Sequence, residues 1–170
     1  TYLVDYQGLD FIRSGFLASV PFLAAFGGVL LSGFVSDFLV KKGASAEVSR
    51  KAPVLTGMLL AVSILGANFT DNTTWVIFFL ALAFFGNGLA SIGWVFISLI
   101  APKNMIGIVG GVFNFLGGTT AIIIPVVIGW LVKDGDFRPA LFMIATLTVI
   151  GFFSYLFIVG KVERIKSRIG

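Results

Sequence analysis

Five long runs of apolar residues fill this chain, and they constrain its fold more than any other feature. The runs cover residues 15–40, 52–70, 75–101, 107–132 and 139–160. An α-helix rises about 1.5 Å per residue, so about 20 apolar residues cross the hydrocarbon core of a bilayer. Each run is about that long or longer. The pattern therefore predicts an all-α, polytopic membrane protein with five transmembrane helices.

The composition agrees with this prediction and excludes several classes of function. Hydrophobic residues make up 58% of the chain and charged residues 12%, which is far from the composition of a soluble domain. Cys and His are both absent, which removes thiol chemistry and Cys/His metal sites. No paired carboxylates and no phosphate-binding glycine loop are recognisable. We therefore expect no enzymatic activity, no metal and no cofactor.

The basic residues are concentrated in the loops on one side of the predicted helices, which predicts the topology. If residues 37–51 form a cytoplasmic loop, this loop, the turn at Lys103 and the C-terminal tail collect nine of the twelve Lys and Arg on one side. Such a bias marks the cytoplasmic face. Trp75 and Trp130 then fall at outer helix ends, where aromatic belts lie. The N-terminus of the chain is predicted outside and the C-terminus inside, and we expect no nucleic-acid partner.

The third run carries a polar stripe. Asn87, Ser91, Trp94 and Ser98 follow one another in steps of four, three and four, so they share one face of a helix. An amide within a bilayer needs a hydrogen-bonding partner or a wet cavity. Two interpretations stay open at this point: hydrogen bonding and packing between helices, or the wall of a ligand cavity.

The fourth run is rich in glycine, which favours close packing of helices on most of that face. Asn114 is the exception, because its amide has several hydrogen-bonding positions to satisfy. The inner turn is centred near Asn104, with Trp94 ten residues before it and Asn114 ten after. In an antiparallel hairpin the two lie at the same depth. This favours the cavity wall.

The first run combines a packing face with a charged inner end. Small residues recur in steps of three and four, which predicts a face for helix packing: Ser14, Ala18, Pro21, Ala25, Gly28, Ser32 and Ser36. At the inner end, a carboxylate follows this face and four cations follow the carboxylate. They could form a breakable ion-pair network that acts as a gate, made of Asp37, Lys41, Lys42, Arg50 and Lys51.

Three stretches resemble the second half of a major facilitator superfamily transporter. Gly33, Ser36 and Asp37, followed by Lys42-Gly43 and Arg50-Lys51, resemble its loop motif. Residues 83–94 and 110–118 look like the tenth and eleventh helices of its anion:cation symporter branch, and the whole chain is similar to bacterial sugar-acid carriers of the galactonate and glucarate type.

The resemblance implies twelve helices in two bundles of six, with substrate bound between the bundles. Residues 1–170 would form most of the C-terminal bundle, and the N-terminal bundle and most of helix seven would lie outside this chain. The substrate site would be lined by Asn114, Ser91, Trp94 and Asn87. The inner gate would comprise Gly33, Ser36, Asp37, Lys41, Lys42, Arg50 and Lys51. Gly93 would leave an open spot without a side chain beside Trp94, where relatives could carry a polar residue.

The resemblance also implies a function. We expect a secondary active transporter of the bacterial inner membrane that imports a sugar acid with protons by alternating access. Its partners would be a small organic anion, protons, the lipid bilayer and the N-terminal bundle of the same protein. The alternatives are a symporter for another organic anion (a hexuronate, an aromatic acid or phosphate) and a non-transporting scaffold or sensor subunit.

Overall fold

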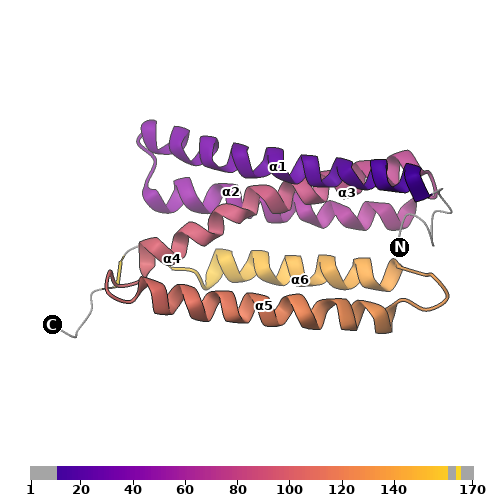
Figure 1. Cartoon of the computed structure of the whole chain (residues 1–170). Coiled ribbons are helices and arrows are strands. Elements are labelled where there is room, and N and C mark those ends of the chain that lie inside the picture. Colours follow the sequence, from indigo (N-terminus) through magenta and orange to yellow (C-terminus); the bar gives the residue numbers. More distant parts are fainter. Residues whose placement is uncertain (1–10, 161–163, 166–170) are drawn as a thin grey trace.

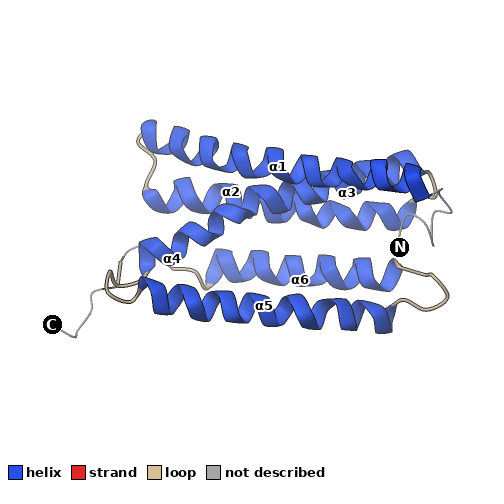
Figure 2. Ribbon diagram, in the orientation of Figure 1, coloured by secondary structure: helices blue, strands red, loops and turns tan. Residues whose placement is uncertain are grey.

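The computed structural model describes residues 11–160 and 164–165, and it places helices side by side along one direction (Figures 1 and 2). A short 3₁₀ segment forms the end of the second span, and another interrupts the third. The elements are α1 (Phe11–Lys41), α2 (Ala46–Ala61), η2 (Val62–Phe69), α3 (Thr73–Ala90), η3 (Ser91–Trp94), α4 (Val95–Ile100), α5 (Ile106–Leu131) and α6 (Arg138–Phe157).

Five of these helical stretches are long and apolar enough to cross a membrane. They are Gly15–Lys41, Glu47–Phe69, Thr73–Ile100, Ile106–Leu131 and Arg138–Phe157. Each coincides with one of the apolar runs to within a few residues, apart from an earlier start of the second. The chain is therefore a multi-pass membrane protein, as the sequence predicts.

The connection between the first two spans is much shorter than the predicted loop of residues 37–51. Helix α1 continues to Lys41 and ends in a glycine cap: Gly43 has a φ of 84°, and the Ala44 amide donates to the Leu39 carbonyl at 3.0 Å. The Ser45 side chain accepts from the Val48 amide and begins α2. The basic residues predicted at the end of the loop therefore stand on α2.

Glycines seat α3 between α1 and α2. A Cβ atom added at Gly28 of α1 would collide with the Phe85 carbonyl of α3, and one at Gly88 of α3 would collide with the Ala25 carbonyl of α1. Gly57 of α2 and Gly86 of α3 face each other in the same way. Lipid is as apolar as these side chains, so close packing of this kind is what holds the helices together.

The packing face predicted for the first run is confirmed by its burial. Pro21, Gly28, Ser32 and Ser36 are buried, while the large apolar side chains of α1 point outward. Ala18 and Ala25 are half-buried, and the side chain of Ser14 lies outside what the structure describes. The strip packs against α3 at Ala25 and Gly28 and meets α2 at Ser36, whose hydroxyl accepts from Arg50.

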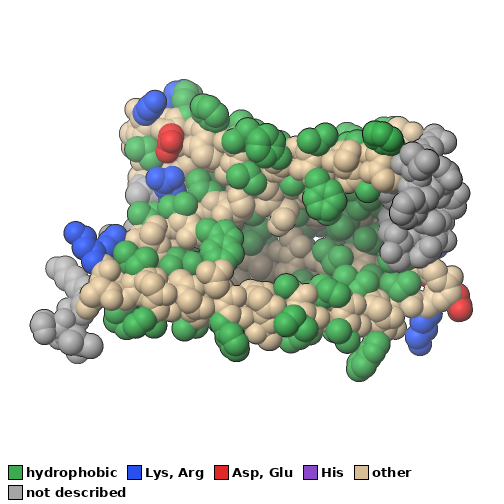
Figure 3. Space-filling view, viewed as in Figure 1, with side chains coloured by type: hydrophobic (Ala, Val, Ile, Leu, Met, Phe, Trp, Pro, Cys, Tyr) green, Lys and Arg blue, Asp and Glu red, His purple; other side chains and the backbone are tan. Residues whose placement is uncertain are grey.

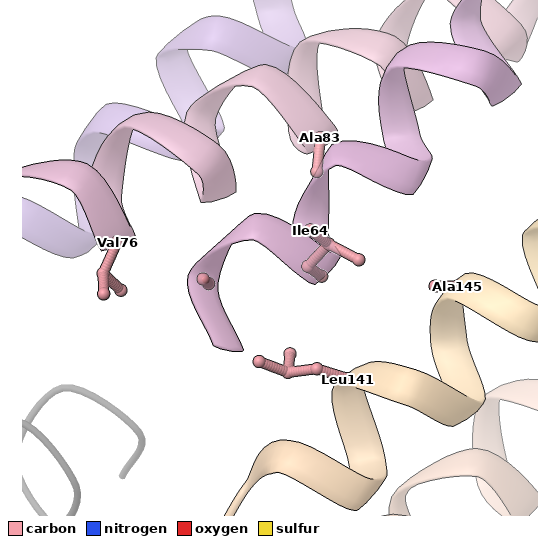
Figure 4. Packing of buried hydrophobic residues seen from close by; sticks show 6 residues of the cluster. Ile64, Val76, Ala83, Leu141 and Ala145 are labelled. Carbon is pink, nitrogen blue, oxygen red and sulfur yellow. The ribbon is translucent and has the colours of Figure 1, made fainter. Parts of the chain in front are cut away.

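Two apolar clusters connect the remaining spans. One joins η2, α3 and α6 through Ile64, Ala67, Val76, Ala83, Leu141 and Ala145 (Figure 4). The other lies nearer the predicted inner end, where Val54 of α2 packs with Ile92 and Phe96 of the third span, and Tyr155 of α6 packs against them. Helix α6 is thus anchored on α2 and on the third span at two levels.

Helix α5 lies at the edge of the assembly, and none of its residues is buried. Its glycine-rich face does not pack as the sequence predicts. A Cβ atom at Gly107, Gly111, Gly117 or Gly118 would meet no other atom within 4 Å, and one at Gly110 would only touch Ile97 at 3.8 Å. Within the part of the chain that the structure describes, only Ile97 of α4 comes near that face.

Candidate functional site

The third span is interrupted where its polar stripe lies. Between α3 and α4, residues Ser91–Trp94 form the 3₁₀ turn η3. The Gly88 carbonyl accepts from the Ser91 backbone amide and from the Ser91 hydroxyl, the latter at 2.7 Å. A serine hydroxyl bonded to its own backbone competes with regular helix bonding, and a 3₁₀ turn within a helix often marks a functional position.

Trp94 meets α5 beside Asn114. The indole of Trp94 lies edge-on to the ring of Phe113, with 4.8 Å between the ring centroids. Trp94 is 50% exposed, and the Asn114 side chain is exposed as well. The prediction that Trp94 and Asn114 lie at the same depth is therefore confirmed to within one residue. Phe113, which the sequence reasoning missed, is the residue that makes the contact.

The other two predicted residues lie along the same span. Asn87 is exposed, between Gly86 and Gly88, whose backbones face α2 and α1. Ser91 is half-buried, and its hydroxyl proton is used within the turn. No hydrogen bond to the amide of Asn87 or Asn114 exists among the described residues. Both amides can therefore bind a polar ligand or water.

The contact of Trp94 with Phe113 joins η3 and α5 in one wall, and α5 borders a depression. Figure 3 shows the molecule hollowed between α1 and α5, with hydrophobic side chains around the rim. Two hydroxyls on α5 are already bonded within the helix: Thr119 donates to the Phe115 carbonyl and Thr120 to the Leu116 carbonyl. The groups that can bind a ligand here are an indole, a serine oxygen and amides, which suit a ligand rich in hydroxyl groups.

Gly93 is buried against other helices of the bundle. A Cβ atom placed on Gly93 would lie 2.9 Å from the Tyr155 hydroxyl and 3.9 Å from Val54 Cγ2. The position therefore points into the bundle, toward α6 and α2. The surface at Gly93 is thus covered by Tyr155 and is not an open spot beside Trp94, because successive residues of the turn project in different directions.

The predicted inner end of the first span holds part of the predicted ionic network. Arg50 Nη1 donates to the hydroxyl of Ser36 at 2.9 Å and lies 3.9 Å from Asp37 Oδ1. Ser36 is fully buried, whereas the Asp37 side chain is 71% exposed. An ion pair this long and this exposed is weak. Its geometry suits a contact that forms and breaks.

The remaining residues of the predicted gate lie apart from this contact. Lys51 donates to Glu47 Oε1 at 2.7 Å and to the Val159 carbonyl at 2.6 Å, which ties α2 to the end of α6. Lys42 lies over the Phe38 ring, Lys41 is exposed, and a Cβ atom on Gly33 would touch nothing within 4 Å. The spacing of Glu47 and Lys51 could have revealed their pair from the sequence.

The chain is similar to bacterial transporters over almost its whole length. It is 48% identical over 164 residues to the D-galactonate transporter of Escherichia coli O6:H1, covering 96% of this chain and 38% of that protein. Identity is 43% over 166 residues to the probable galactarate/D-glucarate transporter GarP of Escherichia coli strain K12, covering 97% and 37%. It is 40% over 165 residues to the probable galactarate/D-glucarate transporter GudP of Bacillus subtilis strain 168, covering 96% and 36%.

The chain thus spans less than two fifths of the length of these curated relatives. Their names describe transporters, which points away from an enzyme. No model of a protein family matches the chain.

Proposed function

Because this chain belongs to the sugar-acid transporters of the major facilitator superfamily, we propose that the protein carrying it moves a sugar acid across a bacterial inner membrane. The substrate is an acid of the galactonate or glucarate type, imported together with protons. The observation that carries the proposal is the wall in which Trp94 meets Phe113 beside Asn114, in a chain closely similar to relatives named for these acids.

The wall recognises the hydroxyl-rich part of the substrate. The Asn114 and Asn87 amides can each donate to and accept from hydroxyl groups, and the Ser91 oxygen can accept. The exposed indole of Trp94 offers an apolar face for the carbon side of the sugar chain. An aromatic acid would leave these amides without partners, which disfavours it.

The carboxylate and the protons require groups from elsewhere in the protein. Neither η3 nor α5 contains Lys, Arg, Asp or Glu. A buried carboxylate without a cation is very costly, so the substrate needs one nearby. The N-terminal bundle supplies both the anion-binding cation and the proton-carrying carboxylate in this proposal, and the two bundles rock around the site between them.

The orientation follows from the charges. Figure 3 shows most of the visible Lys and Arg at the end where α1 finishes and the C-terminus lies. This end is cytoplasmic in the proposal. The Arg50, Ser36 and Asp37 contact then lies at the inner face, where its separation accompanies opening of the inner gate.

The test is uptake of labelled galactonate and glucarate into proteoliposomes that hold the intact protein, with and without an imposed proton gradient. We expect gradient-driven uptake. Asn114→Ala should weaken it about tenfold or more, because the substrate loses a polar partner. Thr120→Ala is the matched control on α5, since its hydroxyl bonds only its own helix.

Each other outcome identifies which part of the proposal fails. Uptake of glucuronate but of neither galactonate nor glucarate would show that the substrate is a hexuronate. Uptake that ignores the gradient would remove proton coupling. Uptake that survives Asn114→Ala would move the site away from α5. Absence of any uptake by correctly inserted protein would favour a non-transporting subunit.

A further inference from the structure

Tyr155 lies behind the candidate site, on the side of η3 that faces α6. Its ring meets Phe96 edge-on, with 5.9 Å between the centroids. It belongs to the inner apolar cluster with Val54 and Ile92. Residues of two other spans therefore hold the ring in place, although no function so far accounts for a tyrosine there.

The Tyr155 hydroxyl lies close to where a side chain at Gly93 would begin. The hydroxyl oxygen would be 2.9 Å from a Cβ atom on Gly93, while the next atoms, Tyr155 Cζ and Val54 Cγ2, would be 3.8 and 3.9 Å away. Only the first of these distances is shorter than ordinary van der Waals contact. The absence of a side chain at position 93 and the hydroxyl on Tyr155 thus fit each other.

This contact affects the direction of Trp94. A 3₁₀ turn has about three residues per turn, so neighbouring side chains project about 120° apart. With Gly93 held against α6, Trp94 points away from α6 and reaches Phe113 on α5. Hydrogen bonds in such turns have poor geometry, so tertiary contacts decide how the turn is rotated.

We propose that Tyr155 is a positioning residue for the sugar-acid site, an inference that rests on the proposed function. Its hydroxyl sets the rotation of η3 by packing against Gly93, and through that rotation it sets the direction of Trp94. Tyr155 itself touches no substrate. The structure assigns it no hydrogen bond among the described residues, so its effect is steric.

A double-mutant cycle in the intact protein tests the proposal. Dissociation constants for galactonate and glucarate are measured for the wild type, Gly93→Ala, Tyr155→Phe and the double variant. We expect Gly93→Ala to weaken binding about tenfold, because its methyl group displaces the turn. Tyr155→Phe should have a smaller effect. The double variant should return to the level of Tyr155→Phe, because the contacts that remain are of ordinary length.

A second measurement reports the position of Trp94 without substrate. In a version whose other tryptophans are phenylalanine, the emission maximum of Trp94 should shift in Gly93→Ala and return in the double variant. Gly151→Ala on α6 is the matched control, since its Cβ atom would only meet the flexible end of Met58 at 3.6 Å. We expect that variant to bind and emit like the wild type.

The outcomes separate this inference from the proposed function. If Gly93→Ala lowers thermal stability but leaves affinity and emission unchanged, the contact is only structural and the positioning role is overturned. A double variant as weak as Gly93→Ala overturns it too. If the wild type binds neither acid while the emission shift and its recovery persist, the substrate assignment fails and the control of Trp94 by Tyr155 stands.

Discussion

Gly28→Ala should destabilise the protein, because α1 and α3 are in backbone contact at that position. The added methyl group would overlap the Phe85 carbonyl and lie 3.0 Å from the Leu89 amide nitrogen. Both are backbone atoms, so no side chain can rotate out of the way and the helices must separate. Overpacking of this kind costs about 1–3 kcal/mol. Replacing glycine by alanine within a helix by itself stabilises the helix by about 0.5–1 kcal/mol. The net loss is therefore roughly 0–2.5 kcal/mol.

Gly27→Ala is the control for this prediction. Gly27 is the preceding residue in the same helix, and a Cβ atom there would meet nothing within 4 Å. The same substitution should then stabilise by about 0.5–1 kcal/mol, because only the helix preference changes. Unfolding by denaturant of the purified intact protein in detergent measures both. Equal stabilities for the two variants would refute the argument that close backbone contact seats α3.

Three further predictions concern the inner end, each measured by the same unfolding experiment. Arg50→Lys should cost about 1 kcal/mol, because an ammonium on a shorter side chain leaves the buried Ser36 hydroxyl without its donor; wild-type stability would contradict this. Gly43→Ala should cost about 1–2 kcal/mol, since alanine disfavours a φ of 84° although the space is empty. Lys51→Met should cost about 1–3 kcal/mol by removing the donor to the Val159 carbonyl, and an unchanged unfolding midpoint would show that water replaces it.

Spacing along the chain was enough to place Trp94 near Asn114. A short turn between antiparallel helices relates positions at equal distances on its two sides, so depth in the hairpin follows from counting residues. The observed contact of Trp94 with Phe113 is one residue from the predicted level. The backbone bonding of Thr119 and Thr120 was predictable for a similar reason, because it lies within one helix.

Counting residues could not predict how each helix is rotated about its own axis. A regular helix through residues 75–101 would not contain the turn at Ser91–Trp94. The direction of Gly93 toward Tyr155 depends on that turn and on a residue 62 positions further along the chain. Likewise, the glycines of α5 have the composition of a packing face, but packing requires a partner helix, and the composition of one helix does not specify which neighbour approaches it.

Hydrophobicity, charge and spacing by themselves determined the fold class, the five spans and the depth of the candidate site. These properties are local: the bilayer selects apolar segments of sufficient length, and short turns fix which helices are neighbours. Only the tertiary structure decided that α3 is seated by glycines between α1 and α2, that Lys51 joins α2 to the end of α6, and that Tyr155 supports the turn bearing Trp94. Those features depend on how each helix is rotated and on how closely backbones approach, which are set by contacts between residues far apart in the sequence.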